Sequence, residues 1–278
     1  MDYPQLKTTA PLSSNPMAKV LTTLFIIVSI WWLCIHPFDS QTVVNGKNIW
    51  SSVYWLISFF GGIFGVIIAY YWQGRKSIIG KAILAFSIGL FLQSFGQIVY
   101  NYYTLFARIE APYPSLGDIG YFGSIFAYIY GALLLAKASG MKYSIQPFRN
   151  RLLAILLPLL MLCASYAIFL HNYQFSGSWI TTMLDFGYPF GQAVYVSIAL
   201  LVVYMSRNYL GGAMGKPIVL LLIALISQYI SDTDFLYQAN HNLWYAGSFG
   251  DYLYTISYFL MAMALVYIGH VRKTTKIE

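Results

Sequence analysis

Eight predominantly apolar stretches, each of about 17 residues or more, follow one another along the chain. They cover residues 20–35, 53–72, 78–103, 119–136, 152–170, 186–205, 218–237 and 252–271. In hydrocarbon every backbone amide must be satisfied inside its own segment, and stretches of these lengths achieve this only as helices. We therefore expect an all-α, polytopic membrane helix bundle with eight transmembrane helices. Gly61 and Gly65, like Gly187 and Gly191, have the small-xxx-small spacing of closely packed helices.

A repeat of polar positions divides these stretches into pairs. Asp118, Asp185 and Asp251 lie 67 and 66 residues apart, and each is followed three positions later by tyrosine. One further step of 67 back from Asp118 reaches Ser51, with Tyr54 again three positions later. Self-similarity at a fixed period predicts four tandem two-helix units. The units are parallel repeats, because two helices return the chain to the side from which it started.

Composition and charge place the bundle in a membrane and orient it. Only 9% of residues are charged, whereas a soluble domain carries roughly a quarter. Of the 16 Lys and Arg residues, all but Lys47 and Arg108 fall on the side of the two termini. Basic residues near helix ends are retained in the cytoplasm, so both termini are expected there. Because these residues are dispersed over several segments with no single basic stripe, we expect no nucleic-acid partner.

The domain organisation is expected to be simple. Residues 1–19 are polar and lack the basic start and cleavage site of a signal peptide, so they are interpreted as a cytoplasmic N-terminal segment. Residues 20–271 form the transmembrane domain, and 272–278 a short basic cytoplasmic tail. The lipid bilayer is therefore the first partner that the sequence predicts.

The repeated aspartates allow two readings. Each would open an inward-going helix, where its side chain can cap free amides of the first turn and complement the positive helix end. In the alternative reading, several Asp–Tyr pairs face a shared outer cavity and bind a cationic or hydrogen-bonding group. Tyrosine three positions after aspartate lies on the same helical face, which suits either reading.

The seventh apolar stretch carries two acids, Asp232 and Asp234, near its outer end. If the helix continues through them, they lie in the outer third of the membrane, where ionisable groups face the bundle interior or a wet cavity. If it ends near Ile230, both lie in the outer loop. Gln228 and Asp232, four apart, can share a helical face, whereas the two acids cannot.

A shift of 133 residues relates polar positions in the second and fourth units. It aligns Asn101 with Asp234 and Asp118 with Asp251, whereas the first and third units have apolar residues at the position of Asn101. This pattern indicates a pseudo-twofold pairing of two halves. It places a shared polar site at the outer ends of the helices.

Signals for catalysis are weak. His36, His171 and His241 fall on the outer side and could hold a metal together with the acids, but their spacings match no ligand motif. The sequence contains no Gly-rich phosphate loop, nucleophile elbow or paired acid/base motif. We expect no enzyme activity, no cofactor and no metal.

Three short motifs carry a resemblance to a known family. They are Tyr113-Pro114-Ser115-Leu116-Gly117-Asp118-x-x-Tyr121, Ser231-Asp232-x-x-x-x-Tyr237 and Gly247-x-x-Gly250-Asp251-x-x-Tyr254. The first resembles the Pro-Ser-x-x-Asp-x-x-Tyr signature of bacterial multi-pass sensor regions that precede diguanylate cyclase, cyclic-di-GMP phosphodiesterase or histidine kinase domains. The resemblance covers roughly residues 20–271 and implies a bacterial inner-membrane location. Only seven residues follow Val271, so it implies a sensor-like module without an effector domain.

The function expected from these features is a non-enzymatic inner-membrane module with an outward-facing acidic and aromatic pocket. It would bind a small-molecule ligand and signal through a membrane or cytoplasmic partner; the alternative is a small-solute transporter or channel. The candidate ligand-binding residues are Asn101, Asp118, Tyr121, Asp232, Asp234, Asp251 and Tyr254.

Overall fold

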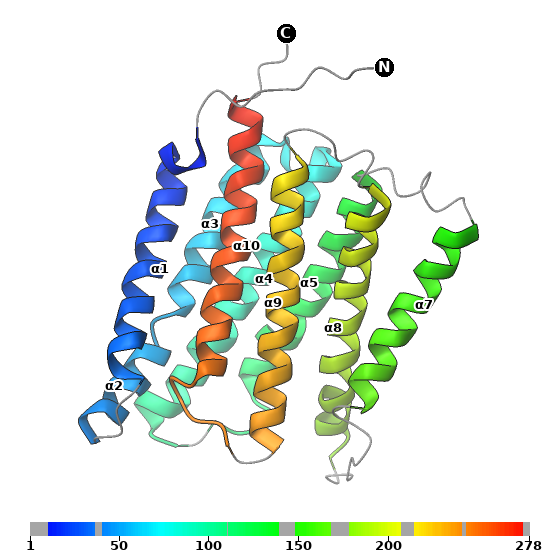
Figure 1. Ribbon diagram of the computed structural model, residues 1–278. Coiled ribbons are helices and arrows are strands. Elements are labelled where there is room, and N and C mark those ends of the chain that lie inside the picture. Colours follow the sequence, from blue (N-terminus) through cyan, green and yellow to red (C-terminus); the bar gives the residue numbers. More distant parts are fainter. Residues whose placement is uncertain are drawn as a thin grey trace.

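The computed structural model describes residues 11–36, 41–109, 111–138, 148–167, 178–206, 214–240 and 243–274 (Figure 1). These residues form helices and connecting turns and contain no strand. The long helices are α1 (Pro16–Ile35), α3 (Trp55–Tyr71), α4 (Ile78–Asn101), α5 (Leu116–Ala138), α7 (Phe148–Ser165), α8 (Trp179–Ser206), α9 (Gly215–Asn240) and α10 (Phe249–Thr274). A shorter helix, α2 (Gln41–Ser51), leads into α3, and a π-helical turn (Tyr102–Ala107) extends α4.

The predicted membrane architecture is confirmed. Within the described residues, eight helical segments are long and apolar enough to cross a membrane. One of them, Gly46–Tyr71, combines the end of α2 with α3. The chain is therefore a multi-pass membrane protein. α1 begins and α10 ends at the same end of the bundle, which we call the terminal end; the opposite end is the distal end (Figure 1).

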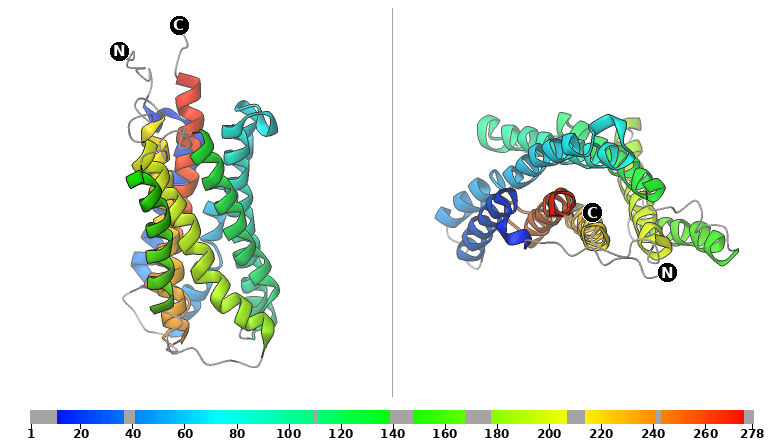
Figure 2. Two further views of the ribbon diagram at one scale, coloured as in Figure 1. Left: turned by 90° about the vertical axis from the view of Figure 1, so that its right-hand side faces the viewer. Right: turned by 90° about the horizontal axis from the view of Figure 1, so that it is seen from above.

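Six helices pack in a closed ring, in the order α3, α4, α5, α8, α9 and α10, with α10 returning to α3. α1 packs against α10 and α3, and α7 packs against α8 (Figure 2). The two helices of each expected unit are neighbours. The order is also the one that two matching halves would give, with α3, α4 and α5 corresponding to α8, α9 and α10. Structural equivalence of the four units stays a prediction.

The predicted glycine contacts are confirmed. A Cβ at Gly61 would lie 2.6 Å from Cβ of Ala262, and one at Gly191 would lie 2.6 Å from Cγ2 of Ile125. α4 and α5 also approach closely through their backbones, since a Cβ at Gly120 would meet the carbonyl oxygen of Leu92. Small residues at these positions let the helices approach closely, and van der Waals packing then holds them together within the lipid.

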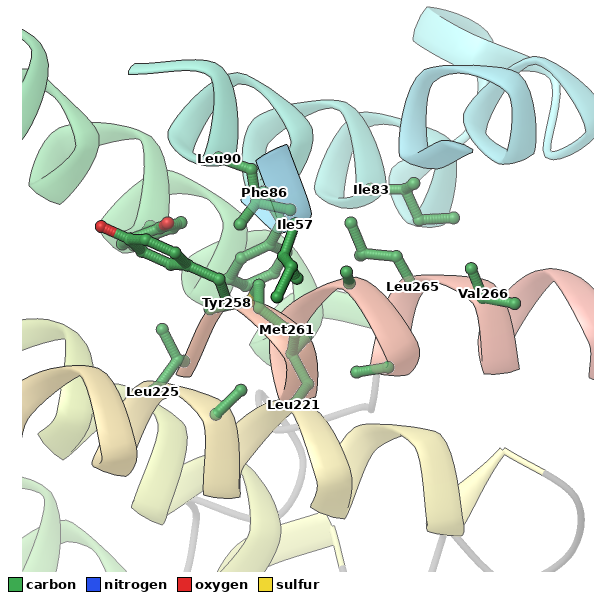
Figure 3. Close-up of a cluster of buried hydrophobic side chains, with 14 of the residues drawn as sticks. Ile57, Ile83, Phe86, Leu90, Leu221, Leu225, Tyr258, Met261, Leu265 and Val266 are labelled. Atoms are coloured by element: carbon green, nitrogen blue, oxygen red, sulfur yellow. The ribbon is translucent and has the colours of Figure 1, made fainter. Parts of the chain in front are cut away.

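An apolar core fills the interior of the ring toward the terminal end. Figure 3 labels some of its members, Ile57, Ile83, Phe86, Leu90, Leu221, Leu225, Tyr258, Met261, Leu265 and Val266. Tyr258 lies at the boundary of this core and directs its hydroxyl away from it (Figure 3). That hydroxyl donates to Oε1 of Gln93 at 2.9 Å. The buried side chains are therefore mainly apolar on the terminal side of Tyr258, with exceptions such as Ser87 and His270, and include more polar groups on the distal side.

The helix ends decide two questions that the sequence left open. α9 continues to Asn240, so Asp232 and Asp234 both lie within the helix rather than in a loop. Asp118 and Asp251 each occupy the third position of their helices, α5 and α10. The expectation that Asp185 also opens a helix is wrong, because α8 begins six residues earlier, at Trp179.

Candidate functional site

A cavity of about 180 Å³ lies between the ring helices at the distal end. It is bounded by the last turns of α4 and α9, the first turns of α5 and α10, the middle of α8, and the loops that follow α4 and α9. Its lining residues are Tyr54, Gln97, Tyr100, Ala111, Pro112, Tyr113, Ser115, Asp118, Tyr121, Tyr188, Gln192, Asp232, Phe235, Leu236, Trp244, Asp251, Tyr254 and Tyr258. An engineered apolar cavity of about 150 Å³ binds benzene, so this volume suits a ligand of similar or slightly larger size.

Asp118 is both a helix cap and a wall of this cavity. Its Oδ2 accepts from the backbone N–H of Ser115 at 2.7 Å, and the hydroxyl of Ser115 in turn accepts from the N–H of Gly117 at 3.1 Å. This is a reciprocal capping arrangement at the start of α5. The other oxygen, Oδ1, accepts from the hydroxyl of Tyr188 on α8 at 2.8 Å. Asp118 therefore caps α5 and also faces a shared cavity, and binding of a ligand there stays a prediction.

Asp251 repeats the arrangement at the start of α10. Its Oδ2 accepts from the N–H of Gly247 at 2.7 Å, and its own N–H donates to the hydroxyl of Ser248 at 3.4 Å. Gly247 has a positive φ of 74°, a conformation that glycine adopts without strain. The carboxyl of Asp251 is buried, with 5% exposure, and it lines the cavity. The Ser-x-x-Asp sequence is thus a shared capping device of the second and fourth units.

Asp232 is held inside the cavity by two neighbours. Its Oδ1 accepts from the hydroxyl of Tyr254 at 2.7 Å. The amide of Gln228, one turn earlier on α9, donates to both carboxyl oxygens at 3.1 and 3.2 Å. Gln228 is itself fixed, since its Oε1 accepts from the hydroxyl of Ser257 at 2.7 Å. The predicted shared face of Gln228 and Asp232 is therefore confirmed.

All four tyrosines of the repeat line the same cavity: Tyr54, Tyr121, Tyr188 and Tyr254. The hydroxyls of Tyr54 and Tyr121 both donate to Oε1 of Gln97, at 3.1 and 2.8 Å. The amide nitrogen of Gln97 donates to the carbonyl oxygen of Ser51 at 3.2 Å. Gln97 thereby joins α4 to the segment before α3 and to α5. The tyrosines of the sequence repeat thus place their hydroxyls around one cavity.

A second, smaller void continues the polar lining on the terminal side of the cavity. Its volume is about 10 Å³, near the minimum that a single buried water needs. Tyr121, Tyr188, Gln192 and Asp232 border both spaces. Two buried polar atoms here have no hydrogen-bond partner, namely Oε1 of Gln192 and the hydroxyl of Tyr195. Unsatisfied buried polar groups are rare in folded proteins and call for an explanation.

The structure brings together five of the seven predicted site residues. Asp118, Tyr121, Asp232, Asp251 and Tyr254 line the cavity. Asn101 lies behind the lining, where its amide donates to the carbonyl oxygen of Ser52 at 3.2 Å.

Asp234 lies outside the lining, on a different face of α9 from Asp232. Its Oδ2 accepts from the amide of Gln238 at 2.7 Å. The same oxygen packs against Gly250 at the start of α10, where there is no room for a Cβ. Asn101 and Asp234 align in the sequence repeat, but neither of them lines the cavity.

Of the four amide side chains that organise the site, sequence reasoning noted only Gln228, for the face it shares with Asp232, and missed the other three. Gln93, Gln97, Gln192 and Gln228 are all buried, with at most 5% exposure, in three different helices. Each lies inside a predominantly apolar stretch. A polar side chain in such a stretch commonly faces the bundle interior and bonds across helices. That general signal would have found them, although the 67-residue period does not include them.

The described residues contain no group of three His, Cys, Asp or Glu side chains placed to hold a metal ion. The carboxyls of Asp118, Asp232 and Asp251 thus border one cavity without converging on a point. Of the three outer histidines, His171 and His241 lie outside the described residues.

No protein-family model matches the chain, and neither a curated protein nor a solved structure matches it.

Proposed function

We propose that this multi-pass membrane protein is a non-enzymatic ligand-binding module whose cavity at the distal end takes a small molecule from outside the cytoplasm. One observation carries the proposal: four repeat tyrosines and three carboxyl groups, from four helices and the turn that precedes α3, border a single cavity of about 180 Å³. Structural capping alone requires none of these side chains to face a common space.

The outward orientation of the cavity is supported by charge. The basic residues gather on the terminal side, and such residues are retained in the cytoplasm. At the terminal end, Arg272 lies over the ring of Trp72 at 5.0 Å and Lys273 over Tyr71 at 4.7 Å. Aromatic and basic side chains together are typical of a membrane–water interface.

The signalling part of the proposal rests on the resemblance of the Tyr113–Tyr121 and Gly247–Tyr254 motifs to bacterial sensor regions. Those two motifs supply both capping aspartates, Asp118 and Asp251, and a large part of the cavity lining. A ligand that bridges α5, α8, α9 and α10 would shift the balance between arrangements of these helices, provided that it binds one arrangement more tightly. A membrane or cytoplasmic partner would then read that arrangement.

A thermal-shift screen of the protein in lipid nanodiscs tests the binding proposal. A ligand that binds only the folded state stabilises it by RT ln(1 + [L]/Kd), so the melting temperature rises with ligand concentration. We expect concentration-dependent stabilisation by at least one class of small molecule. That stabilisation should fall in Asp232→Asn and persist in Asp234→Asn, which changes the same residue type two positions away but outside the lining. A broad library that leaves the wild-type melting temperature unchanged contradicts the proposal.

A transporter for a small solute is the second candidate, and the void bordered by Gln192 and Tyr195 favours it. This void continues the polar lining deeper toward the membrane centre. The buried apolar core on the terminal side of Tyr258 would then have to open during transport. Uptake into proteoliposomes that depends on Asp232 would select this candidate, whereas binding without uptake would select the first.

A further inference from the structure

Hydrogen-bonding capacity around the cavity is unevenly divided between donors and acceptors. Six lining tyrosines already donate their hydroxyl hydrogens to protein acceptors: Tyr54, Tyr113, Tyr121, Tyr188, Tyr254 and Tyr258. The hydroxyl of Ser115 donates to Asp118 at 3.3 Å. A tyrosine hydroxyl has one hydrogen to donate, so these groups have only acceptor lone pairs left for a ligand.

Several acceptors remain available to a ligand. The carboxyls of Asp118, Asp232 and Asp251 carry more lone pairs than their protein donors use, because an ionised carboxylate offers about four acceptor sites. Oε1 of Gln192 is buried, on a side chain with 2% exposure, and accepts no hydrogen bond. The indole N–H of Trp244 is a buried donor without an acceptor, so a hydroxyl or carbonyl on the ligand would find a partner there.

The charge balance points the same way. None of the described residues that line the cavity is Lys or Arg. Lys47, which is buried at the distal end, packs against Gly247 and lies 5.3 Å from the ring of Tyr245, and it is not part of the lining. A carboxylate removed from water is costly unless a cation or several donors accompany it. Among the residues that the structure describes, none supplies a cation to this lining.

The walls between these acceptors are aromatic. The rings of Tyr254 and Tyr258 lie 6.1 Å apart, as do those of Tyr54 and Tyr258, and the ring of Tyr100 meets Trp244 edge-on at 5.7 Å. The faces of such rings attract cations. The carboxyls of the described residues do not converge as metal ligands would, so the cavity suits an organic cation that carries apolar carbon.

We infer that the ligand of this cavity is a small organic amine in its protonated form. Its ammonium group is held by Asp232 and Gln192 at the inner end, and its carbon part lies against the tyrosine rings. The unpartnered Oε1 of Gln192, which borders both the cavity and the void beneath it, marks the position of the ammonium group. This inference rests on the proposed ligand-binding function and names the class of its ligand.

Three probes of one shape separate the charge of the ligand from its size: benzylamine, which is cationic at neutral pH, neutral benzyl alcohol, and anionic benzoate. Binding is measured by equilibrium dialysis against the protein in nanodiscs of uncharged lipid, with empty nanodiscs to correct for partitioning. We expect benzylamine to bind at least about tenfold more tightly than either analogue, since a charge-assisted hydrogen bond contributes about 1.5–3 kcal/mol.

Matched variants locate the contact. Asp232→Asn should weaken benzylamine binding about tenfold or more, and Gln192→Leu should weaken it by a smaller factor, whereas Asp234→Asn should leave it unchanged. Melting temperatures taken in parallel identify any variant that fails to fold. Gln192→Leu keeps the test open if Asp232→Asn does not fold, because the Gln192 oxygen has no protein partner to lose.

Two results would overturn the inference in different ways. Equal binding of benzylamine and benzyl alcohol, or preferred binding of benzoate, would show that the cavity binds ligands but does not select cations. The proposed function would survive that result. If none of the three probes binds, the amine assignment fails; if the broad thermal-shift library also gives no stabilisation, the proposed function fails with it.

Discussion

Tyr188 on α8 donates its hydroxyl hydrogen to Asp118 on α5 at 2.8 Å. This bond joins the tyrosine of the third repeat unit to the aspartate of the second, across one side of the cavity. Asp118 also receives the N–H of Ser115, so the same carboxyl caps a helix and holds a neighbouring helix in place. Because Asp118 has both roles, it couples the shape of the cavity to the packing of the six ring helices.

Tyr188→Phe removes that bond without changing the ring. Because Asp118 keeps its bonds to Ser115, we expect a loss of about 1 kcal/mol in unfolding free energy, the usual net value of one hydrogen bond. Denaturation in mixed micelles with increasing sodium dodecyl sulfate measures it. Tyr130→Phe is the control, since Tyr130 lies on α5 with 54% exposure and no described hydrogen bond of its own; a similar loss in both variants would refute the role assigned to the Tyr188 hydroxyl.

Gln97→Leu should be more damaging than any single tyrosine change. It leaves the hydroxyls of Tyr54 and Tyr121 without their acceptor, and a buried group left unsatisfied costs about 1–3 kcal/mol. We expect a loss of at least about 2 kcal/mol in the same denaturation assay. Gln238→Leu removes a single described bond, to Asp234, and should cost less than half as much. Equal losses would mean that Gln97 does not organise this part of the bundle.

Gly120→Ala and Gly123→Ala form a matched pair on α5. A Cβ at Gly120 would run into the backbone of Leu92 and Gly96, whereas one at Gly123 would lie 3.6 Å from a leucine methyl, an ordinary contact. Gly120→Ala would force α4 and α5 apart, which should cost about 1–3 kcal/mol in unfolding free energy. Gly123→Ala should be neutral or stabilising, because alanine favours a helix by about 1 kcal/mol over glycine. A melting temperature of Gly120→Ala equal to or above that of Gly123→Ala would contradict the close packing of α4 against α5.

Topology can be tested by labelling cysteines from outside intact cells. In a background with Cys34 and Cys163 replaced by serine, Leu243→Cys places a thiol in the distal loop, at a site with 58% exposure. Arg75→Cys places one in the turn between α3 and α4 at the terminal end. We expect a membrane-impermeant maleimide to label the first and not the second. The reverse pattern would put the cavity on the cytoplasmic side.

The membrane class and the helical spans could be predicted because hydropathy and length act locally along each segment. The capping roles of Asp118 and Asp251 were predictable for the same reason, since helix caps depend on neighbouring residues. The ring order was not, because it depends on contacts such as that between Gly61 and Ala262, which are far apart in sequence. Periodicity carries no information about which distant surfaces fit together.

The candidate site was predicted in part for a related reason. The period of 67 residues pointed to the repeat tyrosines and to Asp118 and Asp251, and all of these line the cavity. Gln97 and Gln192 lie outside the period, and their roles depend on neighbours from other units. Asp185 follows the period, yet it bonds to Tyr113 from the second turn of α8 instead of capping the helix. Residues that recur at a fixed sequence period thus occupy similar positions along their helices more reliably than they make the same contacts.

The most direct test of the account is to map where an amine binds. A benzylamine that carries a photoreactive diazirine on its ring would be cross-linked to the protein in nanodiscs, with and without excess benzylamine, and the labelled peptides identified by mass spectrometry. The account predicts labelling that excess benzylamine suppresses, on the peptides that contain Tyr188, Trp244 and Tyr254. Labelling confined to the lipid-facing surfaces of α1 and α7, or labelling that excess benzylamine does not reduce, would contradict it.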